Sequence, residues 1–149
     1  MATIDRFTGD YDFLSNFHPS PIEVDGVTYP TVEHAFQAAK TSIPEEKQAV
    51  AAATTPGSAK RLGRKVQLRP DWEEVKVGIM EDLVRLKFTT HADLRAQLLA
   101  TGDAELVEGN NWNDRFWGVC KGSGQNHLGK LLMKIRAELR SKSAAADSS

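Results

Sequence analysis

The sequence predicts a mostly helical α+β domain with a small antiparallel β portion near its N-terminus. The length of 149 residues is that of one domain with one core. The first part of the chain is rich in glycine, proline, aspartate, serine and aromatic residues, whereas most of the later sequence has the apolar spacing of amphipathic helices. We find no internal repeat and no linker, so we expect a single domain over residues 1–141 and a disordered tail of low complexity over residues 142–149.

The expected β portion is a hairpin around Asp25 and Gly26. The segments PIEV and VTYP flank this pair, and Asp-Gly is a favoured two-residue hairpin turn. A helix is expected next, within YPTVEHAFQAAK at 29–40, because its apolar residues recur at i, i+3, i+4 and i+7. Thr31 is a suitable N-cap for this helix.

Further helices are expected along the rest of the chain. Ser42 and Glu45 form a capping-box pattern before the second helix, and Thr55 precedes Pro56 at the start of the third. Two more are expected at about 72–89 and 92–100, and the last begins after Asn126. AELVE at 104–108 is typical of a short strand, and the stretch 109–125 is expected to be a long loop.

Charge and composition exclude several classes of function. The formal net charge of −1 argues against a dedicated double-stranded DNA-binding protein, but it leaves a nucleotide, or a base at the end of a strand, as a ligand. A single cysteine and the absence of a recognisable signal peptide fit a reducing compartment, so we expect a cytoplasmic protein. No apolar run approaches the roughly 20 residues that cross a bilayer, so no membrane partner is expected.

Three groups of residues are candidates for a functional site. Glu33, Gln37 and Lys40 form a second stripe on the 29–40 helix, for which the alternative is a solvated helix face. The segment LVEGNNWNDRFWG at 106–118 combines carboxylates and aromatic rings in an irregular stretch, and the alternative is a packing loop. KRLGRK at 60–65 suits a phosphate or diphosphate, with a charged, solvated helix as the alternative.

Two other patterns are not expected to be sites. GQNHLGK at 124–130 matches G-x-x-x-x-G-K, but neither Ser nor Thr follows the lysine and Gly129 is expected inside a helix, so we do not expect ATP binding. The four histidines show no metal-ligand spacing with one another or with Cys120. We therefore expect no metal site and no cofactor.

Several blocks of the sequence occur in a recognisable order. They are FLSNF (13–17), GVTYPTVEHAFQAAK (26–40), KRLGR (60–64), VRLKF (84–88), LVEGN with DRFWGVC (106–120) and GQNHLGKLLMKIR (124–136). In order and wording the blocks resemble the YbiA-like N-glycosidases, also called the NADAR (NAD- and ADP-ribose-associated) superfamily. The resemblance extends from about Phe7 to Arg140, and the shared order of the blocks makes it specific.

The resemblance implies a YbiA-like fold and an enzyme that cleaves an N-glycosidic bond at ribose C1. Some members of the family hydrolyse phosphorylated ribosylamine intermediates of riboflavin biosynthesis, and others remove ADP-ribose from guanine. The expected partner is therefore a phosphorylated ribosyl or ADP-ribosyl substrate, with ADP-ribosylated nucleic acid preferred here and a riboflavin intermediate as the alternative. A non-catalytic ADP-ribose-binding module is a third reading, which the retained acids and lysine disfavour.

The resemblance also suggests which residues act in the site. The catalytic residues are expected to be Glu33, Lys40, Glu108 and Asp114. The substrate-binding residues are expected to be Asn16, Phe17, Gln37, Arg61, Arg64, Trp112, Phe116, Trp117, Gly118 and Asn126. In this hypothesis the aromatic loop stacks a base and the arginines hold phosphate.

Cleavage of a ribosyl N-glycoside passes through an oxocarbenium-like state at C1. A carboxylate beside the ring stabilises this charge, and a second group protonates the leaving nitrogen or activates water. Lys40 offers another route, because its amine can form a Schiff base with C1 if the ribose ring opens. That route needs a neutral amine, so Lys40 would have to be partly buried or close to another cation.

Overall fold

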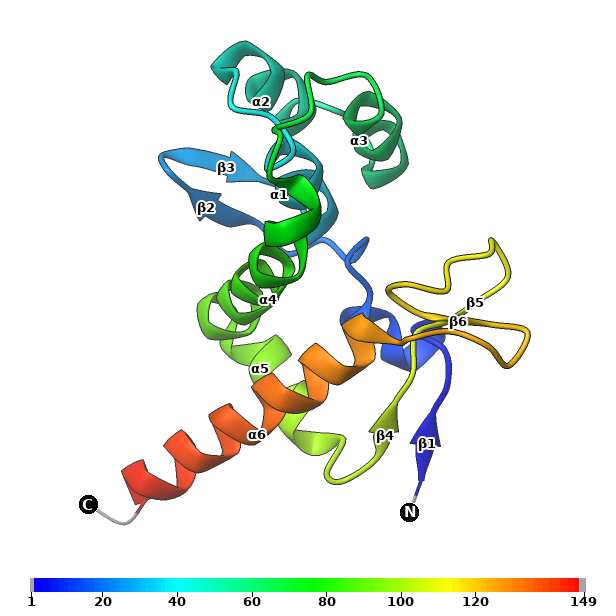
Figure 1. Ribbon diagram of the computed structural model, residues 1–149. Helices are drawn as coiled ribbons and strands as arrows, with labels where there is room; N and C mark the ends of the chain where they lie inside the picture. Colours follow the sequence, from blue (N-terminus) through cyan, green and yellow to red (C-terminus); the bar gives the residue numbers. More distant parts are fainter. Residues whose placement is uncertain (1, 148–149) are drawn as a thin grey trace. The chain divides into compact units, whose positions relative to one another are not determined.

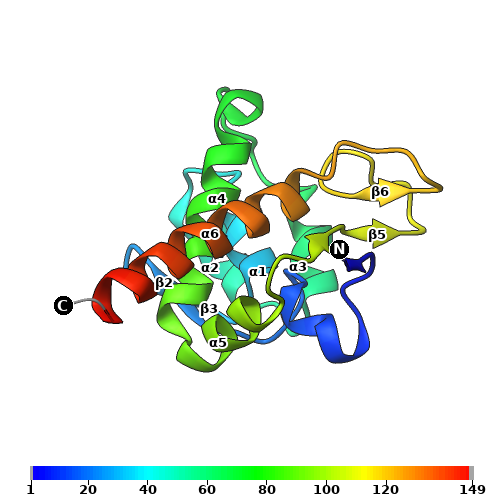
Figure 2. The same ribbon diagram turned by 90° about the horizontal axis from the view of Figure 1, so that it is seen from below.

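The computed structural model describes residues 2–147, whose helices and strands are shown in Figures 1 and 2. The chain divides into two compact units. One unit is Asn16–Thr90, and the other combines Met1–Ser15 with His91–Ser149, so the two ends of the sequence belong to the same unit. The expectation that residues 1–141 form a single domain stays a prediction.

The Asn16–Thr90 unit consists of a hairpin and a set of helices. Its elements, in chain order, are β2 (Ile22–Val24), β3 (Val27–Tyr29), α1 (Val32–Ala38), α2 (Pro44–Ala51), α3 (Pro56–Gly63) and α4 (Trp72–Thr90). The predicted hairpin is confirmed, because Ile22 pairs with Tyr29 in antiparallel register. Asp25 and Gly26 have φ values of 52° and 83°. A two-residue turn with positive φ at both positions matches the twist of the strands, which explains the Asp-Gly pair.

Helix α1 lies at the centre of this unit. Helices α2, α3 and α4 and both strands pack against it, and each of its 7 residues is buried. Thr31 caps the helix as predicted, since its hydroxyl oxygen accepts a hydrogen bond from the His34 N–H at 3.1 Å. The same oxygen lies 2.8 Å from His34 Nδ1, and His34 Nε2 lies 2.9 Å from the Ala53 carbonyl oxygen. Phe36 packs against Trp72 with ring centroids 5.0 Å apart, so the helix is held on its apolar side as well.

The next two helices begin in different ways. Helix α3 begins as predicted, because the Thr55 hydroxyl oxygen accepts the N–H of Ser58 at 3.0 Å. The capping box predicted for α2 is wrong: the N-cap residue is Ile43, which makes no side-chain capping bond. Pro44 occupies the first turn instead, where its fixed φ suits the helix and its missing N–H needs no partner. Ser42 is therefore not needed as a cap.

The other unit contains short parallel strands, of which only the one within 104–108 was predicted. Its elements are β1 (Thr3–Ile4), the 3₁₀ helix η1 (Gly9–Leu14), α5 (Ala92–Ala100), β4 (Glu105–Leu106), β5 (Gly109–Asn110), β6 (Val119–Cys120) and α6 (His127–Asp147). Strand β1 pairs with β4, and β5 pairs with β6. The predicted loop at 109–125 thus contains two strands, each of 2 residues, too short for an alternating pattern to reveal.

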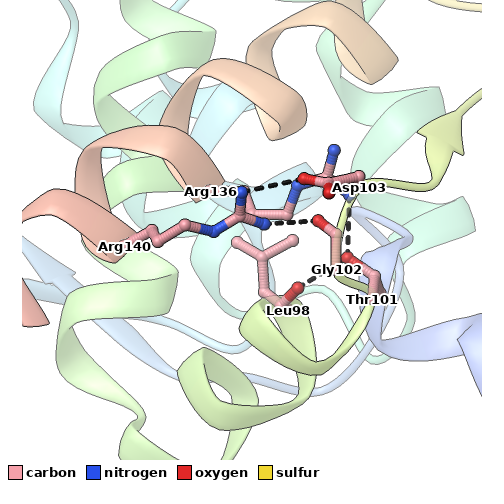
Figure 3. A network of polar contacts seen from close by, with 6 residues as sticks. All are labelled: Leu98, Thr101, Gly102, Asp103, Arg136 and Arg140. Carbon is pink, nitrogen blue, oxygen red and sulfur yellow. Dashed lines mark hydrogen bonds and ion pairs between the residues drawn. The ribbon is translucent and has the colours of Figure 1, made fainter. Parts of the chain in front are cut away.

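Helices α5 and α6 are joined by a polar network at the C-terminal end of α5 (Figure 3). Arg136 Nη1 donates a hydrogen bond to Thr101 Oγ1 at 2.9 Å. Arg140 donates to the Asp103 carboxylate at 2.9 Å and to the Gly102 carbonyl oxygen. Two cations from α6 therefore lie at the negative end of the α5 dipole, where one of them satisfies a carbonyl that follows the helix.

Helix α6 extends further than predicted. It runs to Asp147, so the expected disordered tail is helical over residues 142–147, and residues 148–149 lie outside the described residues. Extending an existing helix costs much less than nucleating one, and the alanines at 144–146 are strong helix formers. Despite its length, α6 is not apolar, and no helix among residues 2–147 is both long and apolar enough to cross a lipid bilayer.

Two helical glycines should respond to alanine in opposite directions. A Cβ on Gly129 of α6 would lie 2.1 Å from the Leu106 carbonyl oxygen, so we expect Gly129→Ala to lower the free energy of unfolding by about 1–3 kcal/mol. Gly78 of α4 has no such neighbour within 4 Å, so Gly78→Ala should raise it by about 0.5–1 kcal/mol. Urea unfolding of both variants checks the pair, and equal effects would contradict the packing described here.

Candidate active site

The polar stripe of α1 is not a solvated helix face. Glu33 and Gln37 are 7% and 4% exposed, and Lys40, just beyond the helix, is half-buried. The backbone N–H of Glu33 donates to the Asn16 carbonyl oxygen at 3.1 Å, which fixes the first turn. Polar groups are seldom buried without a reason. The stripe is therefore the strongest candidate site in the Asn16–Thr90 unit.

Glu33 is a carboxylate in a desolvated position. Its Oε1 accepts a hydrogen bond from Gln37 Nε2 at 2.8 Å. Burial raises the pKa of Glu33 above its usual value, and the hydrogen bond from Gln37 and the charges of Lys60, Lys40 and His34 only partly offset this effect. Burial and the neighbouring groups thus act on this carboxyl in opposite directions, and a perturbed pKa of this kind is common among catalytic carboxylates.

Lys40 has the environment that a nucleophilic amine requires. Burial is the main cause that lowers the pKa of Lys40, and the positive charges of Arg64, Lys60 and Lys76 lower it further, although Glu33 acts in the opposite direction. The sequence-based condition for a Schiff-base lysine, partial burial or a nearby cation, is met on both counts. Within the described residues, the Lys40 amine makes no hydrogen bond or ion pair.

The α3 segment approaches this stripe closely at a glycine and places positive charges near it. A Cβ on Gly63 would lie 1.9 Å from Gln37 Oε1, so only glycine lets α3 approach the amide this closely. Lys60 and Arg64 act on the charge of Lys40, whereas the predicted Arg61 is exposed and donates to Ser58 Oγ within its own helix at 3.0 Å. Lys60 belongs to the predicted basic segment but was not among the predicted substrate-binding residues, although its i, i+4 spacing with Arg64 indicates a shared helix face.

The second cluster belongs to the other unit and centres on Glu108. Asn110 Nδ2 donates to Glu108 Oε2 at 3.0 Å, and Val119 N–H donates to the Glu108 carbonyl oxygen at 2.9 Å. A Cβ on Gly118 would lie 1.8 Å from Glu108 Oε2. Gly118 therefore makes room for the carboxylate, which is a structural role for a residue that was predicted to contact substrate.

Asp114 and Asn126 shape the loop that carries the aromatic residues. Asp114 Oδ1 accepts the backbone N–H groups of Phe116 at 3.1 Å and Trp117 at 2.9 Å. Asn126 accepts from the Glu108 N–H at 3.0 Å through Oδ1 and donates to the Leu106 carbonyl at 3.0 Å through Nδ2. These contacts hold the loop by side chain to backbone hydrogen bonds. The catalytic role predicted for Asp114 and the substrate-binding role predicted for Asn126 stay predictions.

The aromatic residues of the predicted site fall into two kinds. Phe116, Trp117 and His127 pack on one another, with 4.8 Å between the Phe116 and Trp117 centroids and 4.4 Å between those of Phe116 and His127. They therefore resemble the packing loop that was the alternative in the sequence. Trp112 and Phe17, in contrast, are 58% and 44% exposed, so part of each side chain is accessible to a flat ligand.

The predicted residues thus form two clusters, each inside one unit. The Asn16–Thr90 unit brings together Glu33, Gln37 and Lys40 with the cations of α3, and it also holds Asn16 and Phe17. The other unit brings together Glu108, Asn110 and Gly118, and the contacts of Asp114 link this group to the ring cluster. The roles assigned to these residues stay predictions.

Comparison with known proteins gives one family. The model of the NADAR domain matches residues 5–140. N-glycosidase YbiA of Escherichia coli (strain K12) is 46% identical over 133 residues, which cover 87% of this chain and 82% of that protein. A riboflavin biosynthesis protein of Vibrio vulnificus is 41% identical over 134 residues, 88% of this chain and 36% of that protein. The NMR structure of E. coli YbiA is similar with a TM-score of 0.86 and 42% identity, covering 96% of this chain and 88% of that one, which confirms the predicted α+β fold.

The buried charge of Glu33 should reduce the stability of the protein at neutral pH. Because its pKa is raised in the folded state, the folded protein binds this proton more tightly than the unfolded chain, and stability falls as pH rises through the raised pKa. Glu33→Gln should therefore raise Tm at pH 7–8, and the gain should disappear below about pH 4, where the carboxyl is protonated in both states. Thermal unfolding across this range, with Glu74→Gln on the exposed side of α4 as control, checks this; an unchanged or lower Tm of Glu33→Gln at pH 8 would contradict it.

Proposed function

Because the chain belongs to the NADAR family and is an N-glycosidase, we propose that it cleaves the bond between C1 of a phosphorylated ribose and a base nitrogen, with ADP-ribosylated guanine as the substrate. The observation that carries this proposal is the environment of the Lys40 amine. It is a half-buried amine with a lowered pKa, close enough to the buried carboxylate of Glu33 for each charge to act on the other. A nucleophile and a charge-stabilising group are thus present in the same place.

In the proposed reaction Lys40 attacks C1 of the ring-opened ribosyl group. Opening of the ring gives O4′ a proton and leaves C1 as an imine of the base. The Lys40 amine adds to C1, the base departs with a proton on its nitrogen, and a Schiff base between Nζ and C1 remains. Water then hydrolyses the Schiff base, which releases the sugar aldehyde and restores the amine.

Glu33 serves this reaction as a charged group beside C1. Positive charge develops on the sugar during both bond cleavage and imine formation, and a carboxylate in a poorly solvated position stabilises it strongly. The cations of α3, Lys60, Arg61 and Arg64, are suited to hold the phosphate or diphosphate attached to the same sugar.

The preference for an ADP-ribosyl group rests on an exposed aromatic ring. ADP-ribosylated guanine has two bases and a diphosphate, and Phe17, in the same unit as Lys40, presents an exposed ring on which one base can stack. A phosphorylated ribosylamine of riboflavin biosynthesis is the second candidate, because the similar V. vulnificus protein bears that pathway in its name. Both candidates share a 5′-phosphorylated ribose joined to nitrogen, so the chemistry of Lys40 applies to each.

A reductive trap tests the role of Lys40. With substrate and sodium cyanoborohydride, we expect a covalent sugar adduct on the peptide that contains Lys40, detected by mass spectrometry. Lys40→Arg should form no adduct and should lose turnover by at least about a hundredfold. Lys142→Arg, an exposed position on α6 outside the basic segment, is the matched control and should behave as the unmodified protein. Turnover by Lys40→Arg at the original rate would contradict the nucleophilic role.

Parallel reactions distinguish the two substrates. One substrate is an oligonucleotide with ADP-ribosylated guanine, and the other is the ribosylaminopyrimidine phosphate of riboflavin synthesis. Release of ADP-ribose from the first, at a kcat/KM at least about tenfold above that for the second, is the expected result. Release of ribose 5-phosphate alone would transfer the proposal to the riboflavin intermediate, and binding of ADP-ribose without cleavage of either would contradict both substrates.

A further inference from the structure

The side-chain amide of Gln37 is hydrogen-bonded through its nitrogen but, among the described residues, not through its oxygen. Its Nε2 donates to Glu33 Oε1 at 2.8 Å. Its Oε1 is buried and, among the described residues, has no hydrogen-bond partner. The position that a Cβ of Gly63 would occupy is only 1.9 Å from this oxygen and 2.8 Å from Cδ of the same amide. The amide is therefore enclosed between a carboxylate and the bare backbone of α3.

This enclosure determines which way the amide faces. When Glu33 is ionised its oxygens can only accept, so the NH₂ end faces Glu33, and the amide oxygen then points to α3, where it finds a glycine and no donor. An unsatisfied buried acceptor costs free energy, and most are avoided in folded proteins. Such costs are retained mainly where they serve a function. The function that this arrangement can serve is to position the Glu33 carboxyl and to favour its ionised form.

We propose that Gln37 is a positioning residue that holds Glu33 Oε1 and keeps this group an ionised carboxylate, so that Oε2 is the oxygen that faces the reacting sugar. Within the described residues Glu33 Oε2 accepts no hydrogen bond, which leaves it available. A donor fixed on Oε1 favours the anion over the acid. Glu33 then stabilises positive charge at C1, and a different group must protonate the leaving base. This assignment rests on the proposed function.

The other charges near Glu33 act in the same direction as Gln37 and must be kept constant in any test. Among the described residues they are Lys60 on α3, Lys40 after α1 and His34 on α1. None of the variants below changes these three residues. Gly63 belongs to the proposal because its missing side chain is what admits the amide.

The first experiment needs no substrate. The Glu33 carboxyl is titrated by ¹³C NMR in the unmodified protein and in Gln37→Met, Gly63→Ala and Gly57→Ala, with the signal assigned by its loss in Glu33→Gln. Gln37→Met keeps the chain length but removes the donor, and Gly63→Ala forces the amide away. Both should move the titration midpoint of Glu33 upward by a half to one pH unit or more. Gly57→Ala, on the same helix with no neighbour closer than 3.9 Å, is the matched control and should not move it.

The second experiment measures the pH profile of turnover. The acidic limb of kcat/KM should move to higher pH in Gln37→Met by the same amount as the NMR midpoint, with a loss of about twofold at the midpoint of the variant and of about three- to tenfold at a pH well below both midpoints. The double variant Gln37→Ala with Gly63→Ala should recover stability relative to Gly63→Ala, because the collision is gone, but should keep the displaced limb.

The outcomes separate the two proposals. An unchanged midpoint in Gln37→Met would overturn the positioning role whatever the activity. A raised Glu33 midpoint in Gln37→Met, together with no cleavage of either N-glycoside by the unmodified protein, would support the positioning role of Gln37 and overturn the proposed function. A raised midpoint with an unmoved acidic limb would show that Glu33 does not act as an anion in turnover, and would overturn the catalytic part of the assignment.

Discussion

The burial of α1 is the constraint on which the rest of the Asn16–Thr90 unit depends. A helix of 7 residues is too short to be stable alone, so it exists because α2, α3, α4 and the β2–β3 hairpin enclose it. Because its residues are buried, its polar side chains meet much less bulk water than they would on a surface helix. Gln37 Nε2 therefore donates to Glu33, and the pKa of Lys40 is lowered first by burial and then by neighbouring cations.

Close approach at glycines is the means by which both units place polar groups. Gly63 admits the Gln37 amide, and Gly118 admits the Glu108 carboxylate. In the same way Gly129 lets α6 approach the carbonyl oxygen of Leu106. In each case the polar group occupies the volume that a side chain would have taken, without any need for positive φ at the glycine. Glycine here provides space rather than backbone freedom.

Turns and helix caps could be predicted from the sequence where a few adjacent residues determine them. The Asp25-Gly26 turn, the Thr31 and Thr55 caps and the range of α5 follow from turn and capping preferences of adjacent residues. The helical position of Gly129, which excluded a phosphate-binding loop, was likewise correct. The resemblance to the N-glycosidase family could also be read directly, because six blocks keep their order along the chain.

Contacts between segments that are far apart in the sequence could not be predicted. The strand at β4 was predicted, but its parallel partner β1 and the pair β5–β6 are too short to show a pattern of their own. The sequence shows that Glu33 and Lys40 share a stripe, but their burial depends on α3, so Lys60 and Gly63 were not recognised as neighbours. The start of α2 was misplaced because Pro44 overrides the capping pattern of Ser42 and Glu45.

The contacts of His34 show how each of its ring nitrogens is hydrogen-bonded. The Ala53 carbonyl can only accept, so Nε2 of the ring carries a hydrogen, while Nδ1 faces the Thr31 hydroxyl. Both ring nitrogens therefore have partners in the Asn16–Thr90 unit. The imidazole ties the start of α1 to the segment that follows α2.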